Sequence, residues 1–583
     1  MNAPTNPPTF SLDTPSLTLR SEPDGALVLI DNQTGQRVIQ SPSLELFAPV
    51  LEGERGELFF SRMEQVGPGV VDLHFQREGL DSFSVRVEAR PGEDAFDFSC
   101  RFRTRGATQL NAVEFFPRGT ALDCYDVVNY RNRHHTQATW PELLIESGPG
   151  IKTDTYSADW QFAPHPTLLL FRKVRFLFCL AAFDLPRAYG MHLEAAEKKV
   201  KRWHLDYGEK PHGQPLAAGE EFVSPRFRLF ARHGSSVEEM LDVYGRMLIE
   251  AGQIANPTHK VREAWWREPL YCTWIDQVYL SRTVVPVELK DQAKVDVAAP
   301  KSVTILTEQF VRDAVKVILR EKLPIRTILI DAGWAVGTGQ YEPHPERFPN
   351  MRGLVDELHA QGFKVVVWWS WAEIWKDVEV NPAELAGGGK LNRHGARTRD
   401  YSLPATQEYL RKLFHFLFSS DPGCCDLDGV KTDFLADKVH PEIPPADPAW
   451  RGEENYFVQV TRLFYTELKR NKTDGVHIGC AGHFWLAESI DINRTFDVAG
   501  TNYLQHEERA RMLRHTTPGC PVAYDLPNFL ENLERTLLSA QECGASYQVG
   551  NVLATARDPF TAPETPPADY YAALRRLLPY QRR

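Results

Sequence analysis

Residues 327–369 read TILIDAGWAVGTGQYEPHPERFPNMRGLVDELHAQGFKVVVWW, and this stretch decides the fold. Both of its ends, 327–331 and 364–369, are short runs of mostly apolar residues that are typical of buried strands. Between them, residues 354–361 carry apolar side chains at helical spacing. Two buried strands joined by a helix form a β-α-β unit, which predicts a parallel sheet.

The same alternation continues on both sides of this stretch. The predicted strands are 270–275, 327–331, 364–369, 429–433, 475–480, 496–499, 521–525 and 545–549, and the clearest helices are 307–320, 354–361, 407–418, 455–470, 530–540 and 570–578. Eight strands with helices between most of them favour a (β/α)8 TIM barrel over a doubly wound sheet. No glycine-rich phosphate fingerprint follows an early strand, which argues against a dinucleotide-binding fold.

Residues 11–232 have a different pattern of apolar runs and turns. Short runs rich in Val, Leu, Phe and Thr are broken every 8 to 12 residues by turn signals such as Pro23-Asp24-Gly25. This spacing predicts a β-sandwich. Ser236 and Glu239 stand at capping-box spacing, so a helix is expected next. We therefore predict an α/β multidomain chain: an N-terminal β-sandwich over 1–235, a linker helix over 236–261 and a catalytic barrel over 262–583.

Composition excludes several classes of function. With 66 basic and 77 acidic residues the net charge is -11, so a nucleic-acid partner is not expected. The most apolar stretch, 167–185, is interrupted by Arg172, Lys173 and Arg175, which argues against a membrane span. The first 17 residues lack the pattern of a secretory signal, so a cytoplasmic location is expected. Nine scattered cysteines without a C-x-x-C pair predict reduced thiols, no metal and no cofactor.

Acidic residues recur at the ends of the predicted strands. They are Asp276, Asp331, Glu373, Asp433, Asp497 and Asp525. Active sites of (β/α)8 barrels lie at the carboxyl ends of the strands, so these side chains are expected to form a ring there. Carboxylates without a cluster of cations suit glycoside hydrolysis, which needs one ionised carboxylate and one carboxylic acid.

Tryptophan is the second signal. Ten of the 13 tryptophans follow residue 260, and several, including Trp274, Trp334 and Trp371, stand at or near strand ends. An indole ring offers a flat apolar face and an N–H donor, which together suit a sugar ring. Core packing is the alternative reading for about half of them.

Three motifs resemble clan D of the glycoside hydrolases, which includes families 31 and 36. GVKTDF at 429–434 resembles the nucleophile strand of that clan. Residues 326–369 resemble its second strand, its Phe-Pro-Asn helix entry and its third strand, and NRTFD at 493–497 resembles the segment before its acid/base residue. An N-terminal β-sandwich is also the arrangement of this clan.

The resemblance implies roles for individual residues. Asp433 would be the nucleophile and Asp497 the general acid/base, while Lys431 and Arg494 would contact sugar hydroxyls and keep the nucleophile ionised. Asp331 would accept hydrogen bonds from ring hydroxyls. The expected substrate-binding set is Asp331, Trp334, Trp274, Trp371, Lys431, Cys480, Arg494 and Asp525. A structural ion pair for Lys431, a solvated Arg494 and a buried apolar Cys480 are the alternatives.

The expected function is a retaining exo-α-glycosidase that acts on an oligosaccharide or α-glycoside, with α-galactosidase as first choice. Ala332 stands where many family 36 enzymes have a second aspartate, and Thr432-Asp433-Phe434 is more similar to family 31. A family 31-like α-glucosidase or α-xylosidase is therefore the second choice. A transglycosidase and a non-catalytic carbohydrate-binding protein stay open, as does a homo-oligomer.

Overall fold

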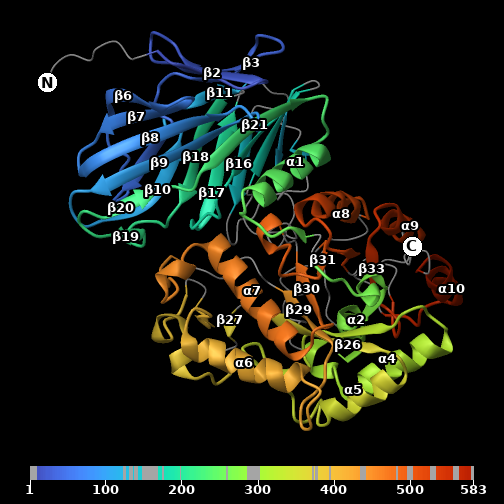
Figure 1. Cartoon of the computed structure of the whole chain (residues 1–583). Coiled ribbons are helices and arrows are strands. Elements are labelled where there is room, and N and C mark those ends of the chain that lie inside the picture. The colour runs from blue at the N-terminus through green and yellow to red at the C-terminus, as the bar shows by residue number, and fades with distance from the viewer. Residues whose placement is uncertain are drawn as a thin grey trace.

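The computed structural model describes residues 9–122, 126–129, 135–136, 142–147, 168–173, 176–196, 199–257, 260–284, 302–370, 373–374, 378–392, 395–433, 441–480, 483–495, 503–525, 533–555 and 563–578. The chain forms a β-rich N-terminal domain and a barrel of strands and helices, with helix α1 (Val237–Glu250) at their junction (Figure 1).

The N-terminal domain contains two antiparallel sheets. One consists of β1 (Ser11–Asp13), β2 (Leu17–Ser21), β3 (Leu27–Asp31), β4 (Arg37–Ser41), β5 (Phe47–Leu51), β10 (Thr108–Phe115), β11 (Thr120–Leu122), β14 (Glu142–Ser147), β17 (Gly190–Ala196), β18 (Lys199–Asp206) and β19 (Gln214–Leu216). The other consists of β6 (Phe59–Gly67), β7 (Val70–Gln76), β8 (Leu80–Arg90), β9 (Ala95–Thr104), β12 (Asp126–Asn129), β13 (His135–Thr136), β15 (Leu168–Lys173), β16 (Phe176–Ala182), β20 (Glu221–Val223) and β21 (Phe227–His233). The predicted sandwich is confirmed.

Strand alternation builds the core of the sandwich. In β8, Phe83, Val85 and Val87 are buried, while the residues between them are more accessible to solvent. Phe115 of β10 packs edge-on against Phe227 of β21, with ring centroids 4.5 Å apart, so the two sheets meet through aromatic side chains.

Helix α1 joins the two domains. Its N-terminus has the expected capping box, in which Ser236 and Glu239 bond to each other's backbone N–H. Tyr244 of α1 lies between Phe230 of the sandwich and Phe484 of the barrel, at 6.5 and 4.9 Å between ring centroids. One continuous core therefore runs from the sandwich through α1 into the barrel.

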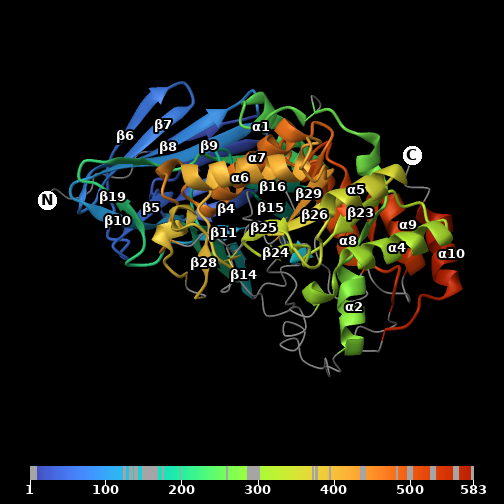
Figure 2. The same cartoon turned by 90° about the horizontal axis from the view of Figure 1, so that it is seen from below.

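The second domain is a closed barrel of eight parallel strands, as predicted. Its strands are β22 (Leu270–Cys272), β23 (Thr327–Ile330), β26 (Lys364–Ser370), β29 (Gly429–Asp433), β30 (Val476–Cys480), β31 (Ile492–Arg494), β32 (Val522–Tyr524) and β33 (Ser546–Val549). Its helices are α2 (Trp274–Val284), α4 (Glu308–Arg320), α5 (Met351–Ala360), α6 (Pro404–Phe418), α7 (Glu453–Asn471), α8 (Tyr503–Thr516), α9 (Leu533–Glu542) and α10 (Ala568–Leu577). Figure 2 shows α4, α5 and α6 on the outside of the barrel.

Short elements accompany the barrel. Two hairpins pair β24 (Ala335–Gly337) with β25 (Gln340–Pro343) and β27 (Glu373–Ile374) with β28 (Arg397–Thr398). The 3-10 helices are η3 (Ala264–Arg267), η4 (Pro382–Glu384), η5 (Ala386–Gly388), η6 (Pro448–Trp450) and η7 (Phe484–Leu486). Among the described residues, none of the helices has the length and hydropathy needed to cross a membrane.

Two strand predictions were wrong in position. The first strand ends at Cys272 rather than 275, because α2 begins at Trp274. The sixth strand is Ile492–Arg494 rather than 496–499, because Arg494 is in parallel register with Cys480 on one side and Ala523 on the other. Residues 496–499 lie outside the described residues.

Candidate active site

Period-two alternation determines which side chains enter the barrel. Its interior contains alternate residues of the strands, among them Leu270, Leu329, Val366, Ile478 and Ile492, and Trp266 packs against them from η3. Continuing the same alternation toward the carboxyl ends of the strands directs polar side chains to the mouth of the barrel. These are Cys272, Asp331, Trp368, Lys431, Asp433, Arg494 and Asp525.

Asp433, at the end of β29, is the centre of this polar group. Arg494 Nη2 donates to its Oδ1 at 2.6 Å, and Trp368 Nε1 donates to its Oδ2 at 2.9 Å. Lys431 Nζ lies 3.8 Å from Oδ2. The side chain of Asp433 is 13% exposed, so these donors leave part of the carboxylate accessible.

The electrostatics of the mouth keep Asp433 ionised. Burial alone raises the pKa of a carboxyl group, but the charges of Arg494 and Lys431 and the hydrogen bond from Trp368 outweigh it. Together they lower the pKa of Asp433 to about 2. An ionised carboxylate at neutral pH is what a nucleophile requires.

Asp331 and Lys431 form a buried ion pair beside Asp433. Lys431 Nζ donates to Asp331 Oδ2 at 2.8 Å, and the thiol of Cys272 lies 3.2 Å from the same oxygen. Asp331 Oδ1 accepts the backbone N–H of Ala332 at 2.8 Å. The carboxylates of Asp331 and Asp433 raise the pKa of Lys431, although its burial and the charge of Arg494 act to lower it.

Arg494 links Asp433 to Asp525. Its Nη1 donates to Asp525 Oδ2, and the guanidinium is completely buried. The backbone N–H of Asp525 donates to Thr495 Oγ1 at 3.1 Å, which fixes the start of the loop after β32. Five charged side chains, Asp331, Lys431, Asp433, Arg494 and Asp525, thus form one continuous network.

Asp276 does not belong to this network, although the sequence placed it in the ring of carboxylates. It lies in the first turn of α2, where its carboxylate accepts the backbone N–H groups of Val552, Leu553 and Ala554 at 2.8 to 2.9 Å. Tyr271 Oη donates to it at 2.8 Å. Its hydrogen bonds fix the loop after β33 to α2, so its part in the ring was wrong.

The predicted tryptophans differ in their surroundings. Trp334 is fully buried and donates its N–H to the carbonyl of Trp368 at 2.8 Å, so it packs in the core and is not exposed for substrate binding as expected. Trp274 is partly exposed at the start of α2 and packs against the interior of the barrel. Trp371, Asp497 and the side chains of Glu373 and Cys480 lie outside the described residues.

Sequence reasoning did not assign Trp368 and Cys272 to the site. Trp368 donates to the predicted nucleophile, and Cys272 contacts Asp331. Strand alternation could have found Trp368, because it is two residues after Val366, which faces the interior of the barrel, and the register of Trp368 with Lys431 agrees with this.

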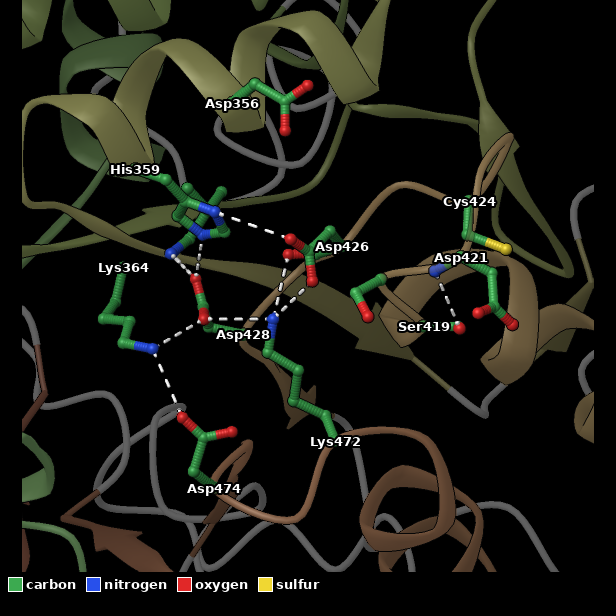
Figure 3. Close-up of polar contacts among 12 residues, drawn as sticks. Asp356, His359, Lys364, Ser419, Asp421, Cys424, Asp426, Asp428, Lys472 and Asp474 are labelled. Atoms are coloured by element: carbon green, nitrogen blue, oxygen red, sulfur yellow. Dashed lines mark hydrogen bonds and ion pairs between the residues drawn. The ribbon is translucent and has the colours of Figure 1, made fainter.

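A second group of charged side chains lies at the opposite, amino ends of the strands (Figure 3). Asp428, just before β29, contacts His359 at 2.7 Å, Lys364 at 3.0 Å and Lys472 at 3.5 Å. Asp426 and Asp474 complete the network by contacting Lys472 and Lys364. These ion pairs tie α5, β26 and the ends of α7 and β29 together.

Among the described residues, no group of His, Cys, Asp or Glu fits a metal ion.

Comparisons with known proteins agree with this architecture. Residues 300–474 match the family model described as the glycosyl hydrolases family 31 TIM-barrel domain. No curated protein sequence matches the chain.

Solved structures of α-galactosidases and of an α-N-acetylgalactosaminidase resemble the fold of the chain. A family 36 α-galactosidase of Geobacillus stearothermophilus is 12% identical, with a TM-score of 0.57 over 100% of this chain and 86% of that one. The α-galactosidase of Lactobacillus brevis is 13% identical, with a TM-score of 0.54 over 98% and 83%. An α-N-acetylgalactosaminidase of Bifidobacterium bifidum is 13% identical, with a TM-score of 0.65 over 98% and 93%.

The sequence of residues 300–474 thus resembles a glycoside hydrolase family, and the fold of the whole chain resembles that of the solved glycosidases above. The chain has a TIM barrel behind an N-terminal β-sandwich, part of its barrel matches a glycoside hydrolase family model, and it resembles the clan D glycoside hydrolases.

Proposed function

We propose that the chain is a retaining exo-α-glycosidase that hydrolyses terminal α-linked sugars, with α-galactosides as the first choice of substrate. The observation that carries the proposal is the state of Asp433, a partly accessible carboxylate whose pKa is lowered to about 2 by neighbouring cations and donors. Its place at the end of the fourth strand of a glycoside hydrolase barrel supports the role of nucleophile.

In the first step Asp433 attacks the anomeric carbon, and the bond from that carbon to the leaving oxygen breaks. Asp497 protonates the leaving oxygen in this step and later removes a proton from the attacking water. The water then releases the sugar from Asp433 with retention of configuration. This assignment of Asp497 rests on its resemblance to the acid/base residue of the clan and on its position just after β31.

The other charged residues of the mouth suit the recognition of sugar hydroxyls. Asp331 and Asp525 supply acceptors, and Lys431 and Arg494 supply donors around the proposed nucleophile. Trp274, Trp371 and Cys480 remain proposed binding residues. The ion pairs keep these groups in place before substrate arrives, which lowers the entropic cost of binding it.

A family 31-like α-glucosidase or α-xylosidase is the second candidate, because the matching family model of the barrel is that of family 31. Ala332 in place of a second aspartate also favours it. A transglycosidase would use the same two aspartates and exclude water from the second step. A non-catalytic carbohydrate-binding protein would bind a glycoside at the mouth of the barrel without cleaving its glycosidic bond.

A panel of nitrophenyl α-glycosides tests the proposal. The galactoside, N-acetylgalactosaminide, glucoside and xyloside should be compared by release of nitrophenolate, and the galactoside should be the best substrate. Asp433→Asn should lower turnover of that substrate by at least about 1,000-fold, because no covalent intermediate forms. Asp356→Asn, on the exposed face of α5, is the matched control and should keep full activity.

The outcomes separate the candidates. Fastest release from the glucoside or xyloside would favour the second candidate, and transfer to an added sugar acceptor in preference to water would favour a transglycosidase. Sugar binding in calorimetry without turnover of any glycoside would leave only the binding protein. A cytoplasmic location and a homo-oligomer also stay proposals, which cell fractionation and light scattering test.

A further inference from the structure

A cavity of about 320 Å³ lies at the amino ends of three neighbouring barrel strands, on the face opposite to Asp433. It lies where the chain enters β22, β32 and β33, which are adjacent in the barrel. Arg267 lines it from the end of η3, Arg514 from the last turn of α8, and Gln541 from α9. No residue of the proposed glycosidase site contributes to it.

The cavity is positively charged. Two arginines line it, and none of the described residues that line it is an aspartate or glutamate. A third guanidinium, that of Arg262, lies against Gly519 in the wall, where a Cβ would come within 1.9 Å of Arg262 Nη2. Such a concentration of cations is notable in a chain with a net charge of -11.

Most of the donors of these arginines are not used by the protein. Arg514 Nη1 donates to the carbonyl of Cys543 at 3.0 Å, and Arg262 Nη2 donates to the carbonyl of Pro257 at 2.7 Å. The Nε of Arg262 is buried without a hydrogen-bond partner. Within the part of the chain that the structure describes, Arg267 has no ion pair. Because a guanidinium carries five N–H donors, the cavity has a large unused capacity to bind an anion.

We propose that this cavity binds a phosphate group, either as inorganic phosphate or as the phosphate of a small phosphorylated sugar. Arginine recognises phosphate oxygens through pairs of parallel N–H donors, which matches the chemistry of the wall. A volume of about 320 Å³ exceeds that of one phosphate ion and leaves room for an attached sugar. Ser546 and Gln541 supply neutral polar side chains beside it.

Calorimetric titration of the full chain at fixed ionic strength tests this site. Inorganic phosphate, a hexose 6-phosphate and the parent hexose are the three ligands. Saturable binding of one or both phosphate ligands is expected, and Arg267→Ala with Arg514→Ala should weaken it at least tenfold. Arg62→Ala with Arg105→Ala is the matched control, since both residues are exposed on the sandwich, and it should bind like the wild type.

The result also tells the two sources of phosphate apart. Tighter binding of the hexose phosphate than of inorganic phosphate assigns the site to a phosphorylated sugar, and the reverse order assigns it to the free ion. Arg267→Glu is a second variant that should keep the fold, because it removes no ion pair or hydrogen bond of the described structure. It should weaken phosphate binding as the double variant does. The absence of saturable binding to wild type, or equal affinity in the double variant and its control, would overturn the proposal. Binding of the parent hexose that is lost in the double variant would also overturn it.

Discussion

At the scale of single residues, the donors around Asp433 explain why a carboxylate at the mouth of a barrel is ionised. Arg494 and Lys431 contribute charge, and Trp368 contributes a neutral N–H donor. A hydrogen bond to a charged group contributes about 1.5 to 3 kcal/mol. The N–H of Trp368 therefore helps to stabilise the ionised form of Asp433.

We expect Trp368→Phe to shift the acidic limb of the pH profile. The substitution keeps an aromatic ring but removes the donor that lowers the pKa of Asp433, so that pKa should rise by about 1 to 2 units. The acidic limb of kcat/KM should move to higher pH by the same amount. Trp369→Phe is the control, because Trp369 is the next residue of β26 and its ring stacks on Tyr341 outside the barrel interior. Equal shifts in both variants would contradict the role of Trp368.

At the scale of elements, strand β31 separates two aspartates, Asp491 and Asp497, that are six residues apart in the sequence. Asp491 precedes the strand and is fully buried at its amino end, where Lys260 and Lys469 lie 3.1 and 2.9 Å from its carboxylate. Arg494 at the other end of the strand bonds to Asp433, and Asp497, which follows it in the sequence, lies outside the described residues. Asp491 is therefore at the amino ends of the strands, away from the face where chemistry is expected, and Asp497 stays the proposed acid/base residue.

We predict opposite effects for alanine at these two positions. Asp497→Ala should lose most activity on poor leaving groups but keep some glycosylation with a nitrophenyl leaving group, and added azide should restore turnover because a small anion needs no general base. Asp491→Ala should instead lower the free energy of unfolding by about 3 to 5 kcal/mol, because it leaves two lysines without their buried partner. Azide rescue and urea unfolding measure the two effects. Azide rescue of Asp491→Ala alone would refute the assignment of Asp497.

The elements also show what the sequence was able to predict. The start of α1 followed from local chemistry, since the predicted capping box of Ser236 and Glu239 is present, whereas α5 begins at Met351, three residues before its predicted start. Asp331 was expected from its place at the end of a predicted strand, and Lys431 was expected only from the resemblance to clan D. The position of Asp276 did not, because its partners are backbone groups some 276 residues away, and no local pattern records them. The burial of Trp334 likewise depends on packing against a neighbouring strand.

At the scale of the whole molecule, ion pairs at the amino ends of the strands connect elements that are distant in the sequence. Although burial acts to raise it, the pKa of Asp428 is lowered to about 2 by the hydrogen bond from His359, the charges of Lys472 and His359, and the backbone N–H of Val365. Figure 3 shows Asp428 between these side chains. A carboxyl group with a lowered pKa stabilises the fold above its unfolded pKa near 4, and this stabilisation is lost as the pH falls toward 2.

We therefore expect Asp428→Asn to weaken the dependence of stability on pH. Between pH 6 and pH 3 the wild type should lose roughly 1 kcal/mol more of its free energy of unfolding than the variant, since the variant has no carboxylate to protonate. Urea unfolding at both pH values gives this difference, and each protein serves as its own reference at pH 6. An equal loss in both proteins would show that Asp428 does not stabilise the fold through its charge.

The core that runs through α1 also has a consequence for the synthesis of the chain. The sandwich leaves the ribosome first, together with the apolar face of α1 that later packs against Phe484. Phe484 follows Tyr244 by 240 residues, so at 5 to 20 residues per second the apolar face stays uncovered for roughly 10 to 50 seconds. During this interval Phe230 and Tyr244 lack the barrel residues that cover them. We expect the nascent chain to depend on chaperones at this stage, and pulldown of ribosome-bound chains stopped near residue 300 should recover them.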